Sequence, residues 1–102
     1  MNWMQQIVEQ YGQEYVIRQL AEESAELCQA CLKTVRSMHG ETPVTRMEAQ
    51  EHMLEEIADV KVILNLMETA VLSEIGVVKI AETCQKKAKR MAERMLEGLD
   101  ND

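Results

Sequence analysis

Residues 52–71 read HMLEEIADVKVILNLMETAV, and this stretch decides the fold. At about 100° per residue, a helix over it places Lys61, Asn65 and Glu68 on one narrow polar stripe. The opposite face is apolar and consists of Met53, Ile57, Val60, Leu64, Met67 and Val71. Apolar residues also occupy much of the remaining surface between positions 57 and 72. The pattern predicts a buried core helix that a single chain could scarcely cover.

Two acidic residues interrupt the apolar side of this helix. Glu56 falls on the apolar face and Asp59 at its edge, both away from Lys61. An ionised carboxylate that faces a core is costly unless it is paired or coordinates a metal. A di-iron site in a helical bundle would use a Glu-x-x-His motif, and no His follows a Glu at that spacing. An all-oxygen set therefore predicts Mg²⁺, with Mn²⁺ as the other candidate.

A second acidic cluster lies in residues 18–33, RQLAEESAELCQACLK. Residues 13–38 are expected to form one helix, in which Glu23 borders the buried stripe while Glu22 and Glu26 lie toward solvent. Alone, this cluster fits a solvated acidic face, but the unpaired acids of the other helix favour a shared metal site. The predicted buried stripe comprises Leu20, Ser24, Leu27, Cys28, Cys31 and Val35.

Breaks in the periodicity predict a short helix near the N-terminus and the connection between the two acidic helices. A short helix over residues 2–11 would end at Gly12. Gly40 and Pro43 end the long helix, and Thr45 with Glu48 fits a capping box for the next. This short connection folds the two acidic helices back antiparallel, so their carboxylates should face each other.

A turn near residues 73–76 precedes the last helix. Its apolar stripe is expected to be Val77, Ala81, Cys84, Ala88, Met91 and Met95. Basic residues flank this stripe: Lys86, Lys87, Lys89, Arg90 and Arg94. They fit either a solvated face near a helix C-terminus or a set of phosphate ligands.

Composition bounds the class of protein. The 102 residues predict one domain, 1–102, of the all-α class, and a net charge of −7 argues against a nucleic-acid-binding surface. No signal peptide or transmembrane run is recognisable, so we expect a cytoplasmic protein without a membrane partner. The three cysteines are expected to be reduced core thiols. His39 and His52 are assigned to structure or solvent.

The order of the two acidic motifs resembles that of a known enzyme family. The order E-E-x-x-E, about thirty residues, then E-x-x-D is matched by Glu22, Glu23 and Glu26, followed by Glu56 and Asp59. This order resembles the MazG-like all-α nucleoside triphosphate pyrophosphohydrolases. The likeness extends to the helix start QYGQEYVIRQLAEE and to the basic helix CQKKAKRMAERM, and so covers most of the chain.

The resemblance implies a four-helix, MazG-like bundle completed by oligomerisation, as a homodimer or homotetramer. It implies Mg²⁺-dependent cleavage of a (d)NTP to (d)NMP and pyrophosphate in nucleotide-pool house-cleaning. A related phosphoribosyl-ATP pyrophosphohydrolase and a non-catalytic helical interaction module remain the alternatives.

The resemblance also implies a role for each of the predicted site residues. The metal ligands would be Glu23, Glu26, Glu56 and Asp59, and Glu22 would orient or deprotonate the attacking water. A Lys and an Arg three residues apart on the last helix would hold phosphate, and Lys87 and Arg90 match them best.

Overall fold

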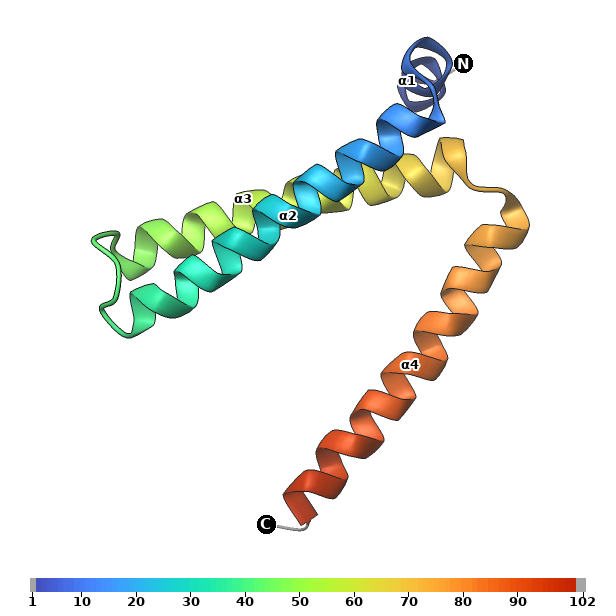
Figure 1. Ribbon diagram of the computed structural model, residues 1–102. Helices are drawn as coiled ribbons and strands as arrows, with labels where there is room; N and C mark the ends of the chain where they lie inside the picture. Colours follow the sequence, from blue (N-terminus) through green and yellow to red (C-terminus); the bar gives the residue numbers. More distant parts are fainter. Residues whose placement is uncertain (1, 101–102) are drawn as a thin grey trace. The chain divides into compact units, whose positions relative to one another are not determined.

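Helices make up most of residues 2–100, the part that the computed structural model describes, and no strand occurs among these residues. It contains α1 (Trp3–Tyr11), α2 (Gln13–Met38), α3 (Arg46–Leu66) and α4 (Glu74–Asp100) (Figure 1). A π-helical segment, η1 (Met67–Val71), continues α3. Two compact units result, Met1–Val71 with α1 to η1, and Leu72–Asp102 with α4. The predicted all-α class is confirmed, whereas a bundle closed by oligomerisation stays a prediction.

Capping residues set the ends of the first helices. Asn2 and Gln5 form a reciprocal capping box at the start of α1. Gly12 ends α1 with a φ of 88°, in the region that glycine adopts without steric cost, and its N–H donates to the carbonyl of Val8. The predicted end of the first helix is therefore confirmed.

Capping also defines the later boundaries. Gly40, with a φ of 66°, follows the end of α2, and the Glu48 N–H donates to the Thr45 hydroxyl at the start of α3 (3.2 Å). At α4 the Gly76 N–H donates to Ser73 Oγ (3.2 Å), so Ser73 caps that helix. The predicted breaks are thus in place, although Gly76 lies inside α4 and not in the turn.

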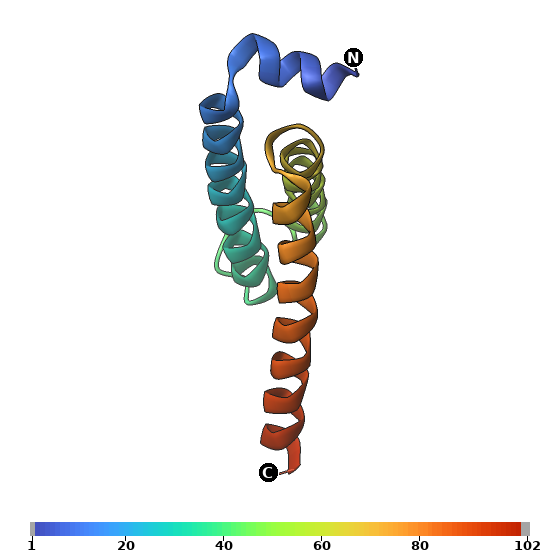
Figure 2. The ribbon, with the colours of Figure 1, turned by 90° about the vertical axis from the view of Figure 1, so that its right-hand side faces the viewer.

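α2 and α3 run antiparallel side by side, joined by residues 39–45, while α1 packs against α2 and η1 (Figures 1 and 2). The residues at their interface recur at alternating four- and three-residue steps, the spacing of a two-stranded coiled-coil seam. On α2 these buried or half-buried residues are Val16, Leu20, Glu23, Leu27, Ala30, Thr34 and Ser37. On α3 and η1 they are Ala49, Met53, Glu56, Val60, Ile63, Met67 and Ala70.

Small side chains bring the helices together near the loop. Ala30 and Ala49 are fully buried, and the Thr34 hydroxyl donates to the Ala30 carbonyl (2.8 Å) and reaches the Ala49 carbonyl across the interface (3.2 Å). Thr34 therefore lies opposite Ala49. Eleven residues back along α2 is Glu23, and eleven residues forward along α3 is Val60, so this register brings Glu23 opposite Val60 and beside Asp59.

The predicted buried stripe of α2 is right only in part, because Leu20 and Leu27 lie in the seam and are half-buried. Cys28 and Val35, placed in the core by the sequence analysis, are exposed, and Val35 retains 51% of its accessible surface. Ala30 and Thr34, which a search for large apolar residues overlooks, are buried instead. Cys28 and Val35 each lie one position, about 100° round the helix, beyond a seam residue, Leu27 and Thr34 respectively.

The apolar side of α3 shows the same displacement. Met53, Val60 and Met67 are half-buried as predicted, but Ile57 and Leu64 are 36% and 44% exposed. The stretch 57–72 is thus only partly covered within the described chain: Leu66 is buried, but Ile57 and Leu64 are not. On the helices, these exposed residues flank the same side of the seam, and we name this flank the apolar edge: Ile17, Cys28, Val35, Ile57 and Leu64.

α4 forms the second unit. Met91 and Met95 of its predicted apolar stripe are 62% and 66% exposed, and Cys84 is exposed too, so the thiol is not in a core as predicted. The three cysteines are free, as expected. No helix within residues 2–100 is long and apolar enough to cross a membrane.

The close approach of α2 and α3 can be tested by overpacking. Ala30→Leu should destabilise the fold by about 1–3 kcal/mol, because three extra carbon atoms must enter a filled seam. Ala25→Leu, at an exposed position of α2, is the matched control. Urea unfolding measures both, and equal stability of the two variants would contradict this packing.

Candidate functional site

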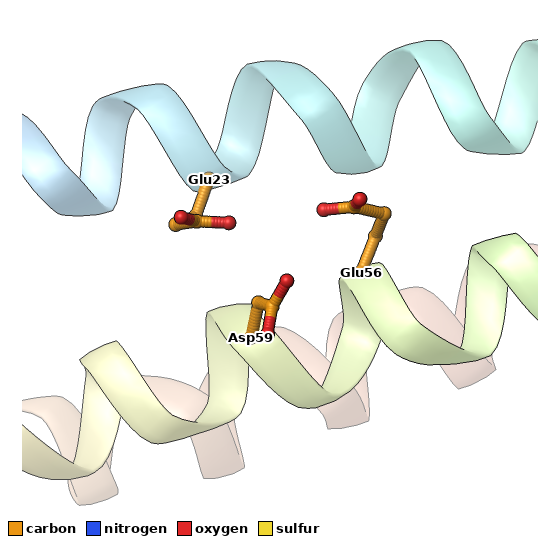
Figure 3. A group of neighbouring side chains, drawn as sticks. All are labelled: Glu23, Glu56 and Asp59. Carbon is orange, nitrogen blue, oxygen red and sulfur yellow. The ribbon is translucent and has the colours of Figure 1, made fainter.

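Three carboxylates meet between α2 and α3. Glu23 points from α2 toward α3, and Glu56 and Asp59 point back from α3 (Figure 3). One oxygen from each lies within 4.8 Å of the others. The predicted meeting of the two acidic motifs across the helix pair is therefore found for these three residues.

The helix register explains why the carboxylates converge. Glu23 and Glu56 occupy seam positions that would normally carry apolar side chains, and Asp59 lies at the rim. Glu56 is only 9% exposed, which confirms its predicted place on the buried side of α3. Two carboxylates are thus held between the helices, where their hydration is reduced.

Two of the buried oxygens have no hydrogen-bond partner. They are Oε2 of Glu23 and Oε2 of Glu56. In the described part of the chain, neither residue nor Asp59 forms an ion pair with a Lys or Arg. Buried polar atoms are nearly always partnered in native proteins, so these oxygens are suited to a ligand that supplies positive charge.

The electrostatics of the cluster act on Glu23. Its pKa is raised above the ordinary value of 4.5, first by burial and then by repulsion from Glu26, Asp59 and Glu56. The raised pKa means that the ionised form of Glu23 is disfavoured without a cation.

His52 is the neighbour that contacts the cluster. Its Nε2 lies 3.2 Å from Oε1 of Glu56, four residues away on α3. The assignment of His52 to a structural or solvent role fits this position, because the ring can fix the orientation of the Glu56 carboxyl and leave Oε2 open toward the cluster.

The remaining predicted residues lie outside the three-carboxylate group. Glu26 is exposed at its margin, and Glu22, also exposed, accepts a hydrogen bond from Gln19 Nε2 (3.3 Å). Lys87 and Arg90 belong to the second unit, where they line a shallow depression of α4 with Arg94 and two methionines. Their predicted contact with phosphate stays a prediction.

A groove of about 610 Å³ opens beside the carboxylates, between α2 and α3. Acidic residues, Glu26 and Glu56, lie at one end, and Lys33 and Arg36 lie further along α2. Its remaining lining residues are Gln29, Ala30, Leu32 and His52. Sequence reasoning missed the two cations, although Lys33 follows Glu26 by seven residues and so shares its helix face.

Comparison with known proteins does not assign the chain to a family. No family model, curated protein or solved structure matches the chain. The geometry of the site therefore carries the functional argument, together with the order of the acidic motifs.

Repulsion within the cluster predicts how stability depends on pH. Since folding raises the pKa of Glu23, metal-free stability should fall as pH rises through 4.5 and through the higher folded-state pKa. Glu23→Gln should lessen this fall and have a higher Tm than the wild type near neutral pH in EDTA.

Glu22→Gln, on an exposed side chain, is the control and should leave the pH profile unchanged. Thermal unfolding from pH 4 to 8 measures the effect. A wild-type profile in Glu23→Gln would show that the carboxylates do not repel one another.

Proposed function

We propose that the protein is a Mg²⁺-dependent nucleoside triphosphate pyrophosphohydrolase. The observation that carries this proposal is the group of Glu23, Glu56 and Asp59, with two unpartnered oxygens held between helices. The order of the acidic motifs, which resembles that of MazG-like enzymes, supports the same function. The biological role would be removal of surplus or aberrant nucleotides.

The donor chemistry favours a hard divalent ion. All three side chains offer oxygen, and the single neighbouring imidazole, His52, is directed to a carboxylate. Carboxylate oxygens suit Mg²⁺ and Mn²⁺ better than softer metals. Glu26, at the margin of the group, is the proposed fourth ligand. Such an ion would polarise the substrate's phosphate oxygens and lower the pKa of a water.

The proposed reaction is hydrolysis at the α-phosphorus. A water oxygen bonds to that phosphorus, the bond to the α,β-bridging oxygen breaks, and pyrophosphate leaves with the bond electrons. Glu22 is the proposed group that orients the water and receives its proton. Lys87 and Arg90 are the proposed contacts that offset the charge of the departing pyrophosphate.

We further propose that the enzyme is a homodimer or homotetramer. The apolar edge and the apolar stripe of α4 expose residues such as Val35, Leu64 and Met95. Exposed apolar side chains on one face of a helix are typical of an association site. A second copy of the chain would cover it and add the packing that one helix pair lacks.

Pyrophosphate release tests the reaction. With Mg²⁺, the protein should release pyrophosphate from one or more members of a panel of canonical and modified NTPs, dNTPs and phosphoribosyl-ATP, and EDTA should abolish release. Glu56→Gln should lower the rate by at least about 100-fold, since even changes that only reorient a metal ligand cost 10- to 100-fold. Glu48→Gln, exposed in the first turn of α3, is the matched control.

Failure to release pyrophosphate from any substrate, with Mn²⁺ also tried, would favour a non-catalytic interaction module. That module also predicts that divalent ions leave the Tm unchanged. Preferred turnover of phosphoribosyl-ATP would instead reassign the substrate and retain the metal site.

Association can be measured by light scattering after size exclusion. The wild type should have two or four times the chain mass of 11.7 kDa. Leu64→Asp, on the apolar edge, should lower that mass, because it places a charge in the proposed interface. Asn65→Asp, the control, adds the same charge on the polar stripe of α3 and should leave the mass unchanged. A monomeric wild type would refute the proposed assembly.

A further inference from the structure

We infer that the groove between α2 and α3 binds a polyphosphate chain, and that Lys33 and Arg36 hold the phosphate groups furthest from the carboxylates. The inference rests on the proposed function, because the acidic end of the groove needs a divalent ion before it can accept an anion. It assigns a phosphate contact within the first unit, in addition to the residues proposed on α4.

The distribution of cations in the first unit supports this assignment. Lys33 and Arg36 line the groove, Arg18 pairs with Glu14 (2.7 Å), and Arg46 and Lys61 lie exposed on α3 outside the groove lining. Within the described residues, neither groove cation has a hydrogen bond or ion pair from its side chain. Two unpaired cations on one flank of an acidic protein are suited to an anionic ligand.

The spacing along α2 suits a chain of two or three phosphates. At a rise of 1.5 Å per residue, Lys33 lies about 10 Å beyond Glu26, and Arg36 about 4.5 Å beyond Lys33. Both side chains are long enough to reach back along the groove. A phosphate group held by a cation at Glu56 would therefore have its distal neighbours within their range.

A purely structural role explains only one of the two cations. Arg36 lies in the last turn of α2, where a positive charge is favourable at the helix C-terminus. Lys33 lies further from that end and is half-buried at the groove, although lysine side chains usually extend into water. A phosphate ligand accounts for both positions.

Isothermal titration calorimetry tests the inference with two probes, Mg²⁺ alone and inorganic tripolyphosphate in excess Mg²⁺. The double variant Lys33→Gln/Arg36→Gln should bind Mg²⁺ within twofold of wild type and tripolyphosphate at least 10-fold more weakly. Lys33→Arg, which keeps the charge, should bind tripolyphosphate within threefold of wild type. Lys61→Gln, which removes one positive charge outside the groove, is the control for the loss of a cation elsewhere and should match wild type with both probes.

The outcomes separate the groove from the metal site. Wild-type tripolyphosphate affinity in the double variant, or an equal loss in Lys61→Gln, overturns the groove inference. A wild type that binds Mg²⁺ but not tripolyphosphate overturns it as well. Mg²⁺ binding that Glu56→Gln leaves unchanged overturns the metal site, while the tripolyphosphate titration still decides whether the groove cations bind phosphate.

Discussion

The structure depends on the placement of ionisable carboxylates inside a helix–helix seam. Glu23 and Glu56 occupy positions that would otherwise be filled by apolar side chains, so the α2–α3 pair gives up hydrophobic contact at its centre. Apart from Glu56, the buried residues in the described part of the chain are Ala30, Thr34 and Ala49 toward the loop and Val16 and Leu66 toward the other end. The helix pair is closely packed toward both ends, and between them it holds buried carboxylates whose charges are unfavourable.

The two flanks of the pair differ in chemistry, and this difference follows from helical geometry. On α2, residues one position after the seam residues are apolar or small, as at Ile17, Cys28 and Val35. On the other flank lie Glu26 and Lys33, which line the groove. One helix can therefore contribute to a polar site and to an apolar surface at once, because the two lie on opposite sides of a single seam.

The sequence predicts the class, the capped helix ends, the antiparallel hairpin and the burial of Glu56, because each depends on local pattern. It does not predict the phase of α2. Hydrophobicity alone cannot distinguish a seam containing Glu23 and Thr34 from the apolar flank beside it. The groove also escapes prediction, because Lys33 and Arg36 acquire a shared cavity only when α3 is placed against them.

The strongest argument for a function is that Glu23 and Glu56 occupy core positions where apolar side chains are usual. Exposed acidic clusters are common on helices, but a carboxylate oxygen that is buried and unpartnered is costly, and here two helices each contribute one. Such local conflicts tend to occur at functional sites, where the stability lost in the free protein is recovered when a ligand binds. A cation that bound Glu23, Glu56 and Asp59 would remove their repulsion and join α2 to α3. Folding and ligand binding would then be linked through the same three side chains.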